Sequence, residues 1–268
     1  MINPKYARLR ITEPEQAYID NMVIGVIDSG IGGLTTLKEI IRVRGGGDYI
    51  YYLDNARHPY GIRSEKEIYS YMRKACDTLA SLGAEAIAIA CNTATAVCID
   101  DLRREYPDTP FIGIEPSIKP AVRHGENICV LATPLTLKQE RFSKLLTGAT
   151  FHMPDCTGLA DAIEEEYPCL ARAQKTLTKA LYRFSDIRFD SAVLGCTHYS
   201  YLGDWISKIL GCPCFDGNGG VARQTRRICG DEQSPARVAL IVTGKGSAPR
   251  YLDLSNLYLG SPVYLIEP

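Results

Sequence analysis

Short, continuous apolar runs alternate with longer amphipathic stretches along the first part of the chain. Continuous apolar runs are typical of strands buried on both faces of a parallel sheet, whereas half-buried strands alternate. Strands are predicted at residues 23–28, 49–54, 86–91 and 111–115, and helices at 34–44, 64–83 and 93–106. This alternation predicts an α/β fold in which helices flank a mainly parallel sheet.

A second series of the same kind follows. Strands are predicted at 127–133, 150–153, 191–196 and 212–215, helices at 136–147, 157–184 and 199–210, and a final pair of strands at 237–244 and 262–268. The glycine-rich stretch at 44–47 predicts a loop that ends a helix, because Gly tolerates the left-handed conformation. Two similar series predict two pseudo-symmetric α/β domains, with the active site in the cleft between them.

The domain boundaries follow from the two series. We expect a polar N-terminal extension over 1–21, a first domain formed by 22–117 and 229–268, and a second domain over 118–228. The C-terminal segment would thus return to the first domain, which carries Cys91, while the second carries Cys196.

Composition narrows the class of protein. The net charge is −1 and charges of both signs are interspersed, so no basic face predicts binding to nucleic acid. The apolar runs are too short to span a bilayer, and the N-terminus has no apolar segment typical of a secretory signal. Ten cysteines are spread without a framework, which favours free thiols in a reducing cytoplasm.

Candidate chemistry gathers where predicted strands end, because ligands of open α/β sheets bind beyond the carboxyl ends of strands. In "VIDSGIGGL", Asp28 and Ser29 end a strand, and the glycines expose backbone N–H groups that favour an anion. A tight turn in which Asp28 or Ser29 caps the helix is the alternative. In "DNARHPYG", Tyr60 and Gly61 form a rigid turn that either lines a pocket or is only a turn.

Two cysteines, Cys91 and Cys196, stand where a strand meets a helix. An inert buried thiol is the usual interpretation of such a residue, but a helix N-terminus favours the thiolate and lowers its pKa. His198 can tune Cys196, and Asp28 can do the equivalent for Cys91. Two such groups on opposite sides of one bound carbon can invert it, one removing a proton and the other returning one.

One metal site has to be weighed against this interpretation. Cys196, His198, Cys212 and Cys214 could in principle supply four zinc ligands. The C-x-C pair lacks the usual ligand spacing, and its two cysteines would share one face of a short strand. We therefore predict no metal, and keep a zinc-bound interaction module as an alternative.

Six stretches occur in an order that carries a family resemblance: "DSGIGGL" (28–34), "PYGIRSEKEI" (59–68), "ACNTATA" (90–96), "IEPSIKPA" (114–121), "LATPLT" (131–136) and "LGCTHYSYL" (194–202). The chain resembles the bacterial glutamate racemases of the cofactor-independent aspartate/glutamate racemase superfamily. The resemblance implies that Cys91 and Cys196 are the catalytic bases, supported by Asp28, His198 and Glu164. The substrate-binding residues that it implies are Asp28, Ser29, Tyr60, Gly61, Cys91, Asn92, Thr93, Thr133, Thr136, Thr197 and His198.

The resemblance also implies how the protein works in the cell. Members of this family use no pyridoxal phosphate and no metal, act in the cytoplasm, supply D-glutamate for peptidoglycan and are often homodimers. Some that have an N-terminal extension are regulated by a peptidoglycan precursor, which makes such a precursor a candidate activator here. Two alternatives stay open: a racemase for aspartate or another acidic amino acid, and a protein that binds glutamate without turnover.

Overall fold

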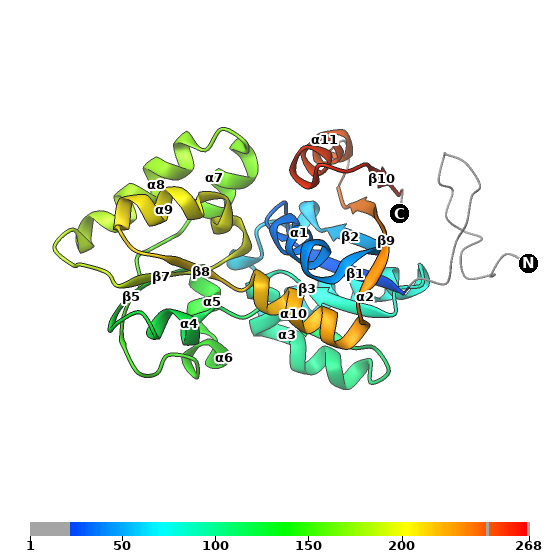
Figure 1. The fold of residues 1–268 in the computed structure, drawn as a ribbon, viewed down its shortest axis with the longest axis horizontal. Helices are drawn as coiled ribbons and strands as arrows, with labels where there is room; N and C mark the ends of the chain where they lie inside the picture. Colours follow the sequence, from blue (N-terminus) through cyan, green and yellow to red (C-terminus); the bar gives the residue numbers. More distant parts are fainter. Residues whose placement is uncertain (1–21, 245–246, 267–268) are drawn as a thin grey trace, which may run out of the picture.

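The computed structural model describes residues 22–244 and 247–266, so the predicted extension over 1–21 lies outside the described residues. The chain folds into two groups of strands and helices side by side, as Figure 1 shows. Each group is built on its own sheet, and every pair of neighbouring strands in both sheets runs parallel. The predicted α/β class with two mainly parallel sheets is confirmed.

The first sheet has six strands in the order β10-β9-β2-β1-β3-β4. Its strands are β1 (Val23–Asp28), β2 (Gly45–Leu53), β3 (Ala86–Ile89), β4 (Phe111–Gly113), β9 (Glu232–Val242) and β10 (Val263–Leu265). Its helices are α1 (Gly33–Arg44), α2 (Glu65–Ser81), α3 (Asn92–Glu105), α10 (Asn218–Cys229) and α11 (Ala248–Leu259). One buried cluster packs α1, α10 and α11 on one face, and another packs α2 and α3 on the opposite face.

The second sheet has four strands in the order β6-β5-β7-β8. Its strands are β5 (Asn127–Ala132), β6 (Thr150–His152), β7 (Ser191–Gly195) and β8 (Cys214–Asp216). Its helices are α4 (Ile118–Val122), α5 (Pro134–Lys138), α6 (Glu140–Ser143), α7 (Leu159–Glu166), α8 (Ala171–Leu181) and α9 (Gly203–Leu210). Helices α7, α8 and α9 cover one face, while α4 and α6 cover the other.

Helix α10 departs from the predicted domain boundary. The prediction assigned residues up to 228 to the second domain, but α10 packs against α1 of the first sheet. Its Val221 and Ala222 share a buried cluster with Leu37, and its Asn218 accepts a hydrogen bond of 2.6 Å from the Thr36 hydroxyl. Because its apolar face is buried there, we propose that the first domain resumes at the start of α10.

Two local predictions are wrong for identifiable reasons. The glycines after α1 form the start of β2 instead of a loop, where a Cβ on Gly46 would lie 1.4 Å from the Ser234 carbonyl oxygen of β9. The predicted helix over 157–184 is two helices, α7 and α8, separated around Pro168. Proline has no N–H to donate and disfavours a helical residue before it, so a helix ends there.

Short 3-10 turns complete the connections near the strand ends: η2 (Asn55–Arg57), η3 (Tyr60–Ile62), η4 (Tyr182–Phe184) and η5 (Thr197–Leu202). Across residues 22–244 and 247–266, none of the helices combines the length and the apolar character needed to cross a bilayer.

Candidate active site

A pocket of about 280 Å³, part of it open to solvent, lies between the two sheets. Residues from both halves of the chain line it, because the carboxyl ends of β1 and β3 face that of β7. Its lining residues are Asp28, Ser29, His58, Pro59, Tyr60, Gly61, Cys91, Asn92, Thr93, Thr133, Ala160, Cys196, Thr197 and His198. The structure therefore brings together most of the residues predicted from the sequence.

Each of the two cysteines stands directly before a helix or a 3-10 turn. Cys91 is the N-cap of α3 in the first half, and Cys196 is the N-cap of η5 in the second. They are 6% and 8% exposed, so both thiols are largely shielded yet reach the pocket. Two thiols thus enter one pocket from two different sheets.

The predicted lowering of the Cys91 pKa is wrong in sign. Burial and the nearby Asp28 carboxylate raise the pKa of Cys91 well above its usual value. The backbone N–H groups of Ala94 and Thr93, at the start of α3, do favour the thiolate, but their effect is smaller. These surroundings therefore favour the thiol form of Cys91.

Cys196 has a different neighbourhood. Its Sγ lies 3.9 Å from Nδ1 of His198, and Nε2 of the same ring lies 2.7 Å from Glu164 Oε2. Burial alone would lower the pKa of His198, but its bonds to Cys196 and Glu164 raise that pKa well above the usual value. Burial acts to raise the pKa of Glu164, but the hydrogen bond from His198 and the charges of His198 and His58 together outweigh it and lower the pKa to about 2. His198 is therefore an imidazolium held between the Glu164 carboxylate and the Cys196 sulfur.

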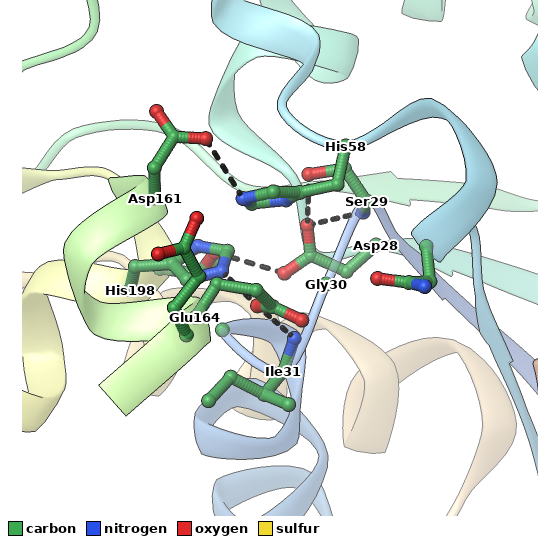
Figure 2. Close-up of polar contacts among 12 residues, drawn as sticks. Asp28, Ser29, Gly30, Ile31, His58, Asp161, Glu164 and His198 are labelled. Atoms are coloured by element: carbon green, nitrogen blue, oxygen red, sulfur yellow. Dashed lines mark hydrogen bonds and ion pairs between the residues drawn. The ribbon is translucent and has the colours of Figure 1, made fainter. Parts of the chain in front are cut away.

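Glu164 also explains the glycine-rich turn after β1. The sequence predicted that this turn would favour an anion, and the Ile31 backbone N–H donates to Glu164 Oε2 over 2.8 Å. The bound anion is the protein's own carboxylate, as Figure 2 shows. Gly30 allows Glu164 to approach the turn, because a Cβ there would lie 2.8 Å from Glu164 Cδ. Gly32 allows η5 to approach, because a Cβ there would lie 2.7 Å from the His198 backbone nitrogen.

Asp28 is fully buried at the end of β1. Its Oδ1 accepts from the Ser29 backbone N–H at 2.6 Å, and its Oδ2 accepts from the Thr197 hydroxyl at 2.8 Å. Burial raises the pKa of Asp28, although the charge of His198 opposes the rise. Asp28 thus joins the two halves of the site as well as facing Cys91.

Three threonine hydroxyls form a buried cluster beside the pocket. Thr93 Oγ1 lies 3.0 Å from that of Thr133 and 3.1 Å from that of Thr136, which are 2.9 Å apart. Thr93 and Thr133 line the pocket, whereas Thr136 is fully buried and outside the lining set. The predicted substrate contact of Thr136 stays a prediction, and its observed contacts orient the other two hydroxyls.

Tyr60 and Gly61 reach the pocket from η3. The Tyr60 hydroxyl donates to Asp54 Oδ2 at 2.7 Å, so it is turned away to a buried carboxylate at the end of β2. A Cβ on Gly61 would lie 3.0 Å from the Thr133 Cβ, which brings this turn against the second half. Tyr60 therefore supplies its ring to the pocket wall.

His58 also lines the pocket, although it was not among the predicted site residues; it lies in the turn "DNARHPYG" with Tyr60 and Gly61. Its side chain is 8% exposed, neither ring nitrogen has a hydrogen-bond partner, and its ring centroid lies 5.1 Å from that of His198. Burial and the His198 charge lower the pKa of His58 to about 4. The signal in the sequence was its place directly before Pro59, in the turn that follows a predicted strand.

The alternative zinc set is not assembled. In the part of the chain that the structure describes, the cluster that could hold a metal ion is His58, Glu164 and His198, without Cys212 or Cys214. Cys212 is instead buried in the apolar cluster of the second half.

A family model for the Asp/Glu/Hydantoin racemases matches residues 24–225, which include the whole second sheet, strands β2, β3 and β4 and most of β1 in the first sheet, and every residue of the pocket. The chain belongs to this family.

Relatives within the family resemble the chain over most of its length. It is 39% identical to a glutamate racemase of Halothermothrix orenii, over 77% of this chain and 85% of that protein. It is 36% identical to glutamate racemase 2 of Bacillus subtilis, over 87% of this chain and 91% of that protein. The crystal structure of the Escherichia coli glutamate racemase in complex with L-glutamate and UDP-MurNAc-Ala is similar to this structure, with a TM-score of 0.82 and 25% sequence identity. The similarity covers 92% of this chain and 97% of that one.

Proposed function

We propose that this racemase interconverts L- and D-glutamate by a two-base transfer of the α-proton, with Cys91 and Cys196 as the bases. The observation that carries the proposal is the entry of two thiols from two different sheets into one pocket. The glutamate racemases among its relatives support glutamate as the substrate.

The unlike neighbours of the two cysteines assign their starting roles. The His198 imidazolium stabilises negative charge on the Cys196 sulfur, whereas burial and Asp28 keep Cys91 as a thiol. In one direction the Cys196 thiolate removes the proton from the α-carbon, and the Cys91 thiol gives a proton to the opposite face. Cys196 ends as a thiol and Cys91 as a thiolate, and the reverse reaction starts from that state.

Removal of the α-proton places charge on the α-carbon and its carboxylate, and fixed dipoles must stabilise it. Asn92 is suited to this role, because both polar atoms of its buried amide lack a partner in the protein. The Ser29, Thr93 and Thr197 hydroxyls line the same pocket. None of the described lining residues is a lysine that could form a Schiff base, so these dipoles take the place of an electron sink.

The remaining expectations about cellular role belong to the same proposal. The relative from Escherichia coli was crystallised with UDP-MurNAc-Ala as an activator, which supports a peptidoglycan precursor as a candidate activator of this protein. We also propose that the protein supplies D-glutamate for peptidoglycan in the cytoplasm and works as a homodimer. Racemisation rates with and without UDP-MurNAc-Ala, and light scattering of the purified protein, test the activator and the dimer.

The decisive experiment follows the circular dichroism of L-glutamate without added cofactor. We expect the signal to decay to zero, and Cys91→Ser and Cys196→Ser each to lower kcat by at least about 10³-fold, because a hydroxyl is a far weaker acid than a thiol. The matched control is Cys169→Ser, which changes an exposed cysteine and should leave the rate unchanged. Full activity in either active-site variant would refute the two-base assignment, and the same assay with L-aspartate tests the alternative substrate.

Deuterium incorporation from D₂O distinguishes a mechanism with two bases from a mechanism with one base. With two bases, D-glutamate formed early from L-glutamate in D₂O carries deuterium at the α-carbon, while the remaining L-glutamate keeps its proton. Early deuterium in the unreacted L-glutamate would indicate that one base exchanges its proton with solvent and serves both faces.

A further inference from the structure

His58 lies in a cluster with Glu164 and His198, and the proposed proton transfer gives His58 no role. One ligand atom from each residue can be chosen so that all three lie within 4.8 Å of one another. Figure 2 shows His58 reaching in from the loop between η2 and η3, toward Asp161 and His198 of the other half. The cluster therefore bridges the two halves of the chain at the wall of the pocket.

Two members of the cluster have polar atoms without partners. Neither His58 ring nitrogen has a hydrogen-bond partner, although the side chain is only 8% exposed. Glu164 Oε1 has no hydrogen-bond partner either, although the Tyr251 hydroxyl lies near the same carboxylate. The nearest carboxylate to His58, that of Asp161, lies 3.7 Å from Nε2, beyond hydrogen-bond distance. Buried polar groups are nearly always paired, so unpartnered atoms on both sides of one small space indicate a missing ligand.

The donor set identifies the class of that ligand. Two imidazole nitrogens and one carboxylate oxygen are a common ligand set for Zn²⁺, with one position left for water. Ligand atoms on a tetrahedral zinc ion lie roughly 3.4 Å apart, given metal–ligand distances of about 2.1 Å. To bind the ion, His198 Nε2 and Glu164 Oε2 would have to move apart from 2.7 Å by about 1 Å. The ligand atoms that are up to 4.8 Å apart would have to approach one another by about 1 Å.

We propose that His58, Glu164 and His198 form a Zn²⁺ site that inhibits the enzyme; the inhibition, but not the site, rests on the proposed function. The ion would bind Nε2 of His198 and release the proton that this nitrogen shares with Glu164. His198 would then no longer be the imidazolium that faces Cys196. The ion would also hold the His58 loop against the second half, which restricts opening of the pocket.

Direct binding to the metal-free protein tests the site. Zn²⁺ competition with a chromophoric chelator should show one ion per chain, and His58→Gln should weaken its affinity by at least about tenfold. The matched control is His152→Gln, which changes a histidine at the far edge of the second sheet and should bind as the wild type does. Equal affinity in His58→Gln and wild type would overturn the proposal.

Cobalt supplies a second measurement that needs no variant. Co²⁺ in the proposed site should show the visible bands of a four-coordinate ion with nitrogen and oxygen ligands. A strong near-ultraviolet thiolate-to-cobalt band, lost in Cys196→Ser, would place the ion on the catalytic sulfur and overturn the proposal.

The activity readout keeps the two proposals separate. Zn²⁺ should inhibit racemisation, a chelator should restore it, and His58→Gln should raise the inhibitory concentration by the same factor as the dissociation constant. Binding that depends on His58 in a protein without racemase activity would support the site and refute the proposed function. Racemisation unaffected by bound Zn²⁺ would refute the inhibition.

Discussion

Replacement of Glu164 by glutamine tests the interaction that distinguishes the two sides of the active site. Glu164 Oε2 accepts hydrogen bonds from both His198 Nε2 and the Ile31 backbone N–H, over 2.7 and 2.8 Å. Glutamine has the same shape and keeps an oxygen acceptor, but it lacks the negative charge. The substitution therefore changes the charge beside His198 while leaving the packing of α7 in place.

The expected change in the pKa of His198 follows from the strength of charge-assisted hydrogen bonds. A neutral acceptor in place of a carboxylate weakens the bond to His198 by roughly 1 to 1.5 kcal/mol. Because one pKa unit corresponds to about 1.36 kcal/mol, the pKa of His198 should fall by about one unit. The imidazolium would then be lost at lower pH, and the alkaline limb of the kcat profile should move down with it.

Stability should change in a defined pH window. The raised pKa of His198 gives stability that is fully present below its unfolded value of 6.5 and lost as pH rises through the higher folded value. The lowered pKa of Glu164 gives stability that is present above 4.5 and lost as pH falls through about 2. The Glu164→Gln variant should therefore be most destabilised between pH 4.5 and 6.5, by about 1 to 3 kcal/mol.

Nitrogen-15 NMR of the imidazole rings measures the effect directly, since the chain has only four histidines. The control is Glu165→Gln, which changes the exposed neighbour that pairs with Arg172. A His198 titration midpoint in Glu164→Gln that is unchanged, or higher than in the wild type, would refute the reasoning.

Two further predictions concern the contact between the halves. Gly32→Ala should lower kcat/KM by at least about tenfold, because its Cβ would lie 2.4 Å from the Thr197 hydroxyl and 2.7 Å from the His198 backbone nitrogen. Gly220→Ala is the control, because a Cβ at that position meets nothing within 4 Å. Its steady-state kinetics should be unchanged, and thermal denaturation should show that the free energy of unfolding increases by up to about 1 kcal/mol. Thr197→Val removes the 2.8 Å hydrogen bond that stabilises the Asp28 carboxylate, so the pKa of Asp28 should rise by about one to two units. Carbon-13 NMR of the carboxyl groups measures this titration, and an unchanged midpoint would contradict the stabilising role of the bond.

The fold was predictable because its strands are buried on both faces. Continuous apolar runs such as 23–28 and 86–91 carry that signal in the sequence alone, and their strands are β1 and β3. Helix α10 was missed because it begins with Asn218 and two glycines, which have low helix propensity and are typical of a turn. Its burial against α1 supplies the stability that its first residues lack.

The chemical residues of the site were predictable, but their electrostatics were not. The junctions at Cys91 and Cys196 could be found from local sequence, since each thiol ends an apolar run before a helix or turn. The sign of the Cys91 pKa shift depends on burial and on Asp28, which comes from a different strand. The role of Glu164 as the anion bound by the Ile31 N–H depends on a contact between residues 133 positions apart. Such contacts arise when the two domains pack together, so they cannot be predicted from the local pattern of apolar and polar residues.

The two cysteines thus have different neighbours although the two domains are built alike. Thermodynamics limits how this difference can affect the kinetic constants for the two enantiomers. Enantiomers have equal free energies, so kcat/KM must be the same in both directions at every pH. The carboxylate beside Cys91 and the imidazolium beside Cys196 can therefore make kcat and KM differ between L- and D-glutamate only by the same factor. If Cys196 is the thiolate in the resting enzyme, one enantiomer meets the correct protonation state at once and the other must first shift a proton. For that second enantiomer, kcat and KM should both differ from the values of the first by the same factor and in the same direction, so that kcat/KM stays common to both.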